Sequence, residues 1–250
     1  MLNVVIPMAG RGSRFAKVGY EDPKPLIKID GVEMIRLVIA NLRPKCEHRF
    51  IFLCLKEHID KYNLDEKLKS WTDNCVIVPV DTVTEGAACT VLLAKQYIDN
   101  DDNLMIANSD QWIDYDINKY LDVMQTSSAD GLIMTMKATD PKWSFVEFDS
   151  TGNVIAVREK QPVSDEATVG IYNFKKGKDF VRGAEQMIAE NHRENGEFYV
   201  APVYDYLIAD NKKIAICNIG NAMYGIGTPE DLNLFLTLDV CKKAVKAAVL

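Results

Sequence analysis

The stretch Leu2-Asn3-Val4-Val5-Ile6-Pro7-Met8-Ala9-Gly10-Arg11-Gly12-Ser13-Arg14 decides the expected fold. Its apolar part, from Leu2 to Pro7, predicts a buried strand, and the part from Ala9 to Arg14 predicts a flexible loop directly after that strand. Glycines in such a loop let the backbone come close to a ligand. The carboxyl end of this strand is therefore an expected ligand-binding position.

Short apolar runs alternate with helical patterns in the rest of the N-terminal half. The runs at 51–55, 75–80 and 104–107 predict strands, and the apolar spacing over 57–70 and 87–98 predicts helices between them. This alternation indicates βαβ units and a parallel sheet. The sequence therefore predicts an α/β fold.

The second half of the chain has a different pattern. The apolar segments 145–148 and 154–157 flank Ser150-Thr151-Gly152-Asn153, which predicts a hairpin. Thr228, followed by a proline and two acidic residues, predicts the start of the last helix. The other expected elements are strands over 132–136, 168–174 and 214–219 and helices over 178–191 and 199–209. Since we find no linker or repeat, one domain over residues 1–250 is the simplest interpretation.

Composition excludes several classes of function. The chain has 29 lysine and arginine residues against 36 aspartate and glutamate residues, a net charge of −7. Without a basic block it is a poor candidate for nucleic-acid binding. Its apolar runs are too short for a membrane span, and its N-terminus lacks the pattern of a signal peptide. Six scattered cysteines and three histidines form no zinc or redox motif. We expect a soluble, cytoplasmic protein without membrane or nucleic-acid partners.

The loop after the first strand carries an unusual density of positive charge for an acidic chain. Cations with glycines between them are suited to phosphate, because charge-assisted hydrogen bonds to phosphate are among the strongest in proteins. The loop is neither a GxGxxG motif nor a Walker loop, so an ordinary glycine turn is an equal alternative on spacing alone. Five cations fall between residues 11 and 28: Arg11, Arg14, Lys17, Lys24 and Lys28.

Two further segments suggest the same chemistry. Pro23 and Pro25 flank Lys24 and hold the backbone extended around its ammonium group, although a rigid surface turn is the simpler interpretation. Asp110 follows an apolar strand, where a carboxylate could hold Mg²⁺ together with substrate phosphates. A helix-capping aspartate is an equal alternative there.

Together these segments resemble a known family. Met8–Arg14 followed by Pro23-Lys24-Pro25-Leu26 resembles the GxGxR…PKxL signature of the sugar-phosphate nucleotidyltransferases, the nucleoside-diphosphate-sugar pyrophosphorylases. Further segments resemble that family's motifs in the same order along the chain. They are Glu85-Gly86-Ala87-Ala88, Asn108-Ser109-Asp110, Arg158-Glu159-Lys160-Gln161-Pro162, Val169-Gly170-Ile171-Tyr172 and Gly227-Thr228-Pro229-Glu230.

The resemblance implies a fold and a reaction. The fold is a single-domain GT-A-like α/β structure, a three-layer α/β/α arrangement with a mixed, mostly parallel central sheet. Its N-terminal half binds the nucleotide and its C-terminal half the acceptor. The reaction joins an NTP (CTP, UTP or dTTP) to a phosphorylated acceptor, first of all a sugar 1-phosphate, and releases pyrophosphate. Such products serve capsule or surface-polysaccharide synthesis, and a homo-oligomer is compatible with the family.

The resemblance also implies roles for individual residues. Arg14 would bind the β- and γ-phosphates, Lys24 the α-phosphate and Lys160 the acceptor's phosphate, while Asp110 would hold Mg²⁺. Nucleotide contacts would come from Ala9, Gly10, Arg11, Gly12, Ser13, Glu85, Gly86, Ala87, Asn108 and Ser109. Acceptor contacts would come from Glu159, Gly170, Glu197 and Gly225.

One departure from the family pattern concerns the metal. Members that make NDP-sugars usually carry a second metal aspartate two residues before the GTPE motif, where this chain has Gly225. Either Glu197 or Asp205 supplies the missing ligand, or Gly225 makes room for a differently shaped acceptor while waters complete the metal's shell. We favour the second interpretation, because Mg²⁺ usually keeps several waters.

Other functions remain open at this stage. A second departure concerns the acceptor: Gly196-Glu197-Phe198-Tyr199-Val200-Ala201-Pro202 lacks the Thr-Asp pair that many members carry after the aromatic residue. It leaves open a cytidylyltransferase that acts on a non-sugar phosphate such as phosphocholine or phosphoglutamine. A non-catalytic nucleotide sensor would explain the loss of the aspartate at Gly225, although the cations are retained. A GT-A glycosyltransferase would require a DxD pair, and Asn108-Ser109-Asp110 lacks the first acid.

Overall fold

The computed structural model describes residues 1–249. In chain order its elements are β1 (Leu2–Met8), α1 (Ser13–Ala16), η1 (Lys24–Leu26), β2 (Lys28–Ile29), β3 (Val32–Glu33), α2 (Met34–Leu42), β4 (His48–Leu55), α3 (Lys56–Tyr62), α4 (Leu64–Trp71), β5 (Cys75–Val80), α5 (Ala87–Leu92), α6 (Lys95–Ile98), β6 (Asn103–Ala107), β7 (Gln111–Ile113), α7 (Ile117–Thr126), β8 (Gly131–Lys137), β9 (Ser144–Phe148), β10 (Val154–Glu159), β11 (Glu166–Phe174), α8 (Gly177–Ala189), α9 (Val203–Ala209), β12 (Ile214–Asn218), β13 (Met223–Gly225), α10 (Pro229–Leu236) and α11 (Asp239–Val249).

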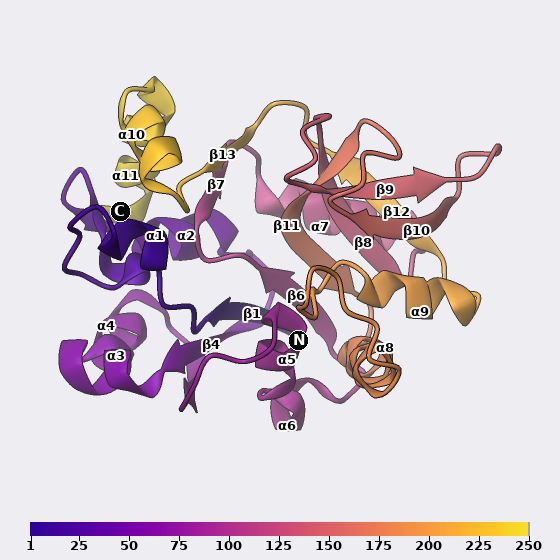
Figure 1. The fold of residues 1–250 in the computed structure, drawn as a ribbon, viewed down its shortest axis with the longest axis horizontal. Helices are drawn as coiled ribbons and strands as arrows, with labels where there is room; N and C mark the ends of the chain where they lie inside the picture. The colour runs from indigo at the N-terminus through magenta and orange to yellow at the C-terminus, as the bar shows by residue number, and fades with distance from the viewer. Residues whose placement is uncertain (250) are drawn as a thin grey trace.

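A mixed sheet of nine strands runs through the molecule (Figure 1). The strands of the N-terminal half pair in parallel: β1 lies between β4 and β6, and β5 extends the sheet beyond β4. In the second half, β11 is antiparallel to β6, β8 and β9, and β9 and β10 form the expected hairpin. The first strand is therefore central, as its continuous apolar run predicts.

Helices cover both faces of this sheet. Side chains alternate along β1, so that Val4 and Ile6 pack with α2, α4 and α7 in one core, while Val5 packs with α5, α8 and α9 in a second core. The elements thus form three layers, α/β/α, and the fold class expected from the sequence is confirmed (Figure 1). Within residues 1–249 no helix combines the length and apolarity that crossing a bilayer requires.

A third, smaller core fixes the C-terminal helices beside the first loop. Phe15 from α1 and Trp112 from β7 pack in it with Phe235 from α10. In Figure 1 the yellow helices α10 and α11 lie next to the indigo segment that contains α1. This packing brings the start of α10 close to the carboxyl ends of β1 and β6.

Two expected helices are broken into shorter ones. The segment 57–70 forms α3 and α4, because Asn63 between them has a left-handed conformation, with φ of 50°. Asparagine tolerates this conformation better than most residues. The segment 87–98 forms α5 and α6, since the amides of Leu93 and Ala94 bond three residues back and tighten the helix at that point.

The helix expected over 199–209 begins later, at Val203. The segment before it is tied at Phe198 to the start of α5 and the loop that precedes that helix. The amide of Phe198 donates to the carbonyl of Glu85 at 2.9 Å, and its carbonyl accepts from the amide of Ala88 at 3.0 Å. Residues 200–202 then form turns, in which the amides of Val203 and Tyr204 bond three residues back, and α9 starts only after Pro202.

Candidate active site

Two adjoining cavities lie at the carboxyl ends of β1, β6 and β10. One, of about 330 Å³, contains Asp110 and Gly225, and we name it the Asp110 cavity. The other, of about 410 Å³, contains Glu159 and Gly170, and we name it the Gly170 cavity. Because both are lined by the same five residues, they form one continuous site. The shared residues are Arg14, Asn108, Lys142, Trp143 and Lys160.

The loop after β1 and the lysine between two prolines meet at Asp110. Lys24 Nζ lies 2.7 Å from Asp110 Oδ2, and both side chains are partly exposed. Gly12 has φ of 61°, and a Cβ atom there would lie 2.9 Å from the Cβ of Lys24. Only glycine therefore allows the loop to pass this close to Lys24.

The cations of this loop divide into two groups. Arg14 lines both cavities, and Lys24 contacts Asp110. Arg11, Lys17 and Lys28 have exposed side chains and line neither cavity. The high charge density of the loop thus overstates the number of cations that the site uses.

The surroundings of Asp110 leave room for a cation on one side. The Asp110 carbonyl accepts from the amide of Ile226, which ties the end of β6 to the segment after β13. Gly227 lies against the carboxylate, and a Cβ there would lie 2.3 Å from Asp110 Oδ2. The lack of a side chain at Gly227 thus opens a cradle beside Asp110.

The Asp110 cavity contains a second carboxylate, that of Asp231. Its Oδ2 atom lies 3.6 Å from the place where a Cβ of Gly225 would be, and it accepts from the hydroxyl of Thr228 at 2.9 Å. Within residues 1–249, no three histidine, cysteine, aspartate or glutamate side chains gather as a metal site. One or two carboxylates suffice for an Mg²⁺ ion that also binds substrate phosphates, so this donor set fits such an ion.

Lys160 is held in an unusual backbone conformation at the junction of the cavities. Its φ is 56°, in the left-handed region, and its amide donates to the carbonyl of Trp143 at 2.9 Å. Its Nζ lies 3.4 Å from the hydroxyl of Tyr199. Nearby, Lys142 Nζ lies 4.9 Å from the centre of the Trp143 ring. Strained non-glycine residues of this kind cluster at functional sites.

Glu159 and Gly170 lie in the Gly170 cavity, as the resemblance implies. Glu159 is buried and accepts from the hydroxyl of Ser144, and burial raises the pKa of its carboxyl group above 4.5. Gly170 has φ of 76° at an irregular point of β11, and a Cβ there would lie 2.1 Å from Asn108 Nδ2. Bulges of this kind are common beside active sites.

The expected base-binding loop reaches the Gly170 cavity through Ala87, which lines its wall. Gly86 packs against the backbone of Phe198, and a Cβ there would lie 2.4 Å from the Phe198 carbonyl oxygen. Glu85 has an exposed side chain, which pairs with Arg193 at 2.9 Å. This loop is therefore fixed by the segment that leads into α9.

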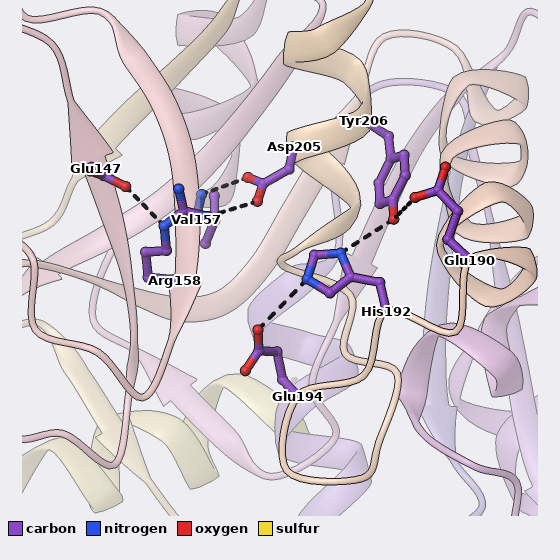
Figure 2. Close-up of polar contacts among 8 residues, drawn as sticks. All are labelled: Glu147, Val157, Arg158, Glu190, His192, Glu194, Asp205 and Tyr206. Atoms are coloured by element: carbon purple, nitrogen blue, oxygen red, sulfur yellow. Dashed lines mark hydrogen bonds and ion pairs between the residues drawn. The ribbon is translucent and has the colours of Figure 1, made fainter.

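Some expected site residues lie elsewhere. Asp205 lines neither cavity: it accepts from the amide of Val157 and from the guanidinium of Arg158, and so holds α9 against β10 (Figure 2). Glu197 is exposed and lines neither cavity. Ser109 is buried behind the site. The interpretation that Glu197 or Asp205 replaces the missing aspartate gains no support from this geometry.

Three residues of the site had no distinct signal in the sequence. Lys142 lines both cavities, yet in sequence it is one lysine among many in a polar segment. Asp231 belongs to the sequence pattern of a helix start, and its amide does donate to the capping hydroxyl of Thr228, but it also lines the Asp110 cavity. Gln111 could have been suspected only because it follows Asp110.

A central mixed sheet with cations gathered over its carboxyl edge defines a nucleotide-handling protein of the GT-A-like class. The family model for nucleotidyl transferase matches residues 3–235. The chain belongs to this nucleotidyl transferase family, and the family expected from the motifs is confirmed.

Individual relatives agree with the family. The bifunctional protein GlmU of Methanocaldococcus jannaschii is 23% identical over 236 residues, which cover 92% of this chain and 52% of that protein. GlmU of Methanococcus aeolicus is 26% identical over 92% of this chain and 53% of its own length. The chain thus spans about half the length of these curated relatives.

Solved structures show the same fold. A nucleoside-diphosphate-sugar pyrophosphorylase from Vibrio cholerae superposes with a TM-score of 0.81 at 27% identity, over 94% of this chain and 100% of that one. The inositol-1-phosphate CTP transferase from T. maritima gives a TM-score of 0.73 at 17% identity, over 98% and 95% of the two chains. The second likeness, at this low identity, concerns the fold alone.

Proposed function

We propose that this protein transfers a nucleotidyl group from CTP, UTP or dTTP to a phosphorylated small-molecule acceptor and releases pyrophosphate. The observation that carries the proposal is the continuous site in which Arg14, Lys142 and Lys160 surround Asp110 and its partner Lys24. In-line attack of one phosphate on another requires positioned cations more than acid–base groups. The site supplies such cations, and none of the three histidines lines either cavity.

In this mechanism the two halves of the chain have separate tasks. The loop from Ala9 to Ser13 and the segment from Glu85 to Ala87 hold the nucleotide. Arg14 binds the β- and γ-phosphates, which leave as pyrophosphate, and Lys24 neutralises charge at the α-phosphate. Lys160 holds the acceptor's phosphate, whose oxygen attacks the α-phosphorus as the bond to the leaving pyrophosphate breaks. Asp110 would hold Mg²⁺, which supplies further positive charge to the phosphates when bound.

Two acceptor classes are candidates. A sugar 1-phosphate fits the polar wall of the Gly170 cavity, where the buried carboxyl group of Glu159 can hydrogen-bond a sugar hydroxyl. A non-sugar phosphate, such as phosphocholine or phosphoglutamine, is the second candidate. It is favoured by the space at Gly225, where the nearest neighbour of an added Cβ would be Asp231 Oδ2, at 3.6 Å.

We further propose that the product serves capsule or surface-polysaccharide synthesis in the cytoplasm, where nucleoside triphosphates are available. The test is to incubate the purified protein with Mg²⁺, each NTP and a panel of sugar 1-phosphates and non-sugar phosphates, and to measure pyrophosphate. We expect release that requires one NTP and one acceptor together. If no pair in a broad panel releases pyrophosphate while the NTPs bind, a nucleotide sensor becomes the better interpretation.

A further inference from the structure

Gln111 carries a polar group that no residue described by the structure satisfies. The residue begins β7, directly after Asp110, and only 7% of its surface is exposed. Within residues 1–249 its side-chain Nε2 has no hydrogen-bond partner. An unpaired buried amide destabilises a fold, so its retention beside a substrate cavity indicates that a ligand supplies the partner.

The pairing of β7 with β13 places this amide beside the departure from the family pattern. Gln111 and Gly225 are directly opposed in the antiparallel pair, so their side-chain positions share one face of the two strands. Both residues line the Asp110 cavity. The family's aspartate would stand at this place, whereas Gly225 puts no side chain opposite the buried amide of Gln111.

Neighbouring groups place the amide on the acceptor side of Asp110. Gln111 Oε1 lies 3.1 Å from the place where a Cβ of Gly170 would be, so the side chain extends toward the Gly170 cavity. Lys142 and Lys160 line the same walls and give them a positive charge. An anionic oxygen is the ligand atom that such surroundings and an N–H donor would both attract.

We propose that Gln111 is an acceptor-binding residue: its Nε2 donates a hydrogen bond to a phosphate oxygen of the acceptor, in the space that Gly225 leaves open. This inference rests on the proposed function, because it assumes that the acceptor carries a phosphate. It also explains the glycine at 225: an aspartate there would accept the hydrogen bond of the Gln111 amide and would repel the phosphate.

The first experiment uses Gln111→Met, which keeps the side-chain volume and removes the donor. We expect the KM for the acceptor to rise about tenfold, the KM for the NTP to change less than twofold, and the melting temperature to stay equal or rise. If Gln111 has only a structural role, the variant has a lower melting temperature and an unchanged acceptor KM. That result overturns the proposal. The same substitution on a remote helix, Gln186→Met, serves as the control and leaves both KM values unchanged.

The second experiment uses Gln111→Glu, whose outcome separates two kinds of ligand. If the partner is a phosphate oxygen, the added charge raises the acceptor KM more than Gln111→Met does. If the partner is instead water on a metal ion, the new carboxylate tightens Mn²⁺ binding and preserves turnover, and the proposal is wrong. Electron paramagnetic resonance of free Mn²⁺ measures that binding without turnover.

A third measurement is independent of the proposed reaction. Inorganic phosphate, as a minimal probe of the acceptor's phosphate, is titrated into the wild-type protein and Gln111→Met by calorimetry. Weaker phosphate binding by the variant supports the inference, and equal or absent binding in both proteins overturns it. The proposed function fails separately, when no NTP and acceptor pair releases pyrophosphate.

Discussion

Lys24 Nζ lies 2.7 Å from Asp110 Oδ2, although 86 residues separate them in the chain. The contact joins the lysine between two prolines to the aspartate at the end of β6, and it depends on the close approach of Gly12. Both groups remain partly exposed, so phosphates can compete for the lysine and a divalent cation for the aspartate. The pair therefore keeps two opposite charges ready at the place where the nucleotide phosphates are expected.

We expect Lys24→Ala and Arg14→Ala each to lower kcat by about 10²–10³-fold, the usual effect of losing a group that stabilises transition-state charge. Stability should change by less than about 1 kcal/mol, because the Lys24 ion pair is partly exposed. Steady-state kinetics with thermal denaturation measure both effects. Lys24→Ala should also tighten Mn²⁺ binding, since Asp110 loses its cation partner. A loss below threefold in both variants would remove phosphate handling from this loop.

Activity should require Mg²⁺ or Mn²⁺ and disappear in excess EDTA. Side-chain cations alone neutralise a triphosphate poorly, and Asp110→Asn should therefore abolish most turnover. Asp231→Asn is the matched comparison, since it also replaces a carboxylate of the Asp110 cavity by an amide. Its amide oxygen can still accept from the hydroxyl of Thr228, so the start of α10 is preserved. Full activity of the wild-type protein in EDTA would contradict the assignment of Asp110.

Glu159→Gln separates acceptor binding from stability. Burial raises the pKa of the Glu159 carboxyl group above 4.5, so ionisation of this group lowers the free energy of unfolding. This destabilisation is present above the raised pKa and disappears as the pH falls through it. We expect Glu159→Gln to have a higher melting temperature than wild type at pH 7, with a difference that shrinks toward pH 4.5. Its acceptor KM should rise at all pH values.

Gly170→Ala should damage the site beyond the cost of backbone strain. Its Cβ would lie 2.1 Å from Asn108 Nδ2, in a conformation with φ of 76°. Gly152→Ala, in the hairpin turn, has a similar φ of 85° but no atom within 4 Å, so it measures strain alone, about 1 kcal/mol. We expect the second variant to keep its activity and the first to lose most of it. Equal kinetics for the two variants would show that the packing of Asn108 against Gly170 does not contribute to activity.

The sequence predicts the sheet better than it predicts the helices. Continuous apolar runs, such as Leu2–Pro7, identify buried strands because both faces of a central strand need apolar side chains. Helix ends depend on tertiary contacts. The segment that leads into α9 is fixed by hydrogen bonds between Phe198 and the distant residues Glu85 and Ala88, which no local pattern contains.

The residues of the site likewise divide into those that the local sequence predicts and those that tertiary contacts bring there. Arg14, Lys24, Asp110 and Lys160 stand in segments that resemble the family's motifs, and the fold brings them to one continuous site. Lys142 and Gln111 reach that site through the packing of β9 and β7, and their own sequence neighbourhoods carry no such pattern. Conversely, Asp205 has the right residue type but serves to join α9 to β10 (Figure 2).

The glycine at 225 allows the decisive test of how this site departs from its family. Gly225→Asp restores the carboxylate that NDP-sugar-forming members carry. The new Cβ has room, since its nearest neighbour would be Asp231 Oδ2 at 3.6 Å, so we expect the variant to fold. The two carboxylates would then lie close together and repel each other, and the space beside Gln111 would be filled.

On this reasoning Gly225→Asp should leave NTP binding and Mn²⁺ affinity within about twofold of wild type while it raises the KM for the native acceptor. Gly225→Ala is the matched control, because it adds the Cβ without the charge and should have a much smaller effect. Titration of Mn²⁺ and steady-state kinetics with both substrates distinguish the cases. If Gly225→Asp instead tightens the metal and raises turnover with the native acceptor, the glycine is a lost ligand rather than space for the acceptor.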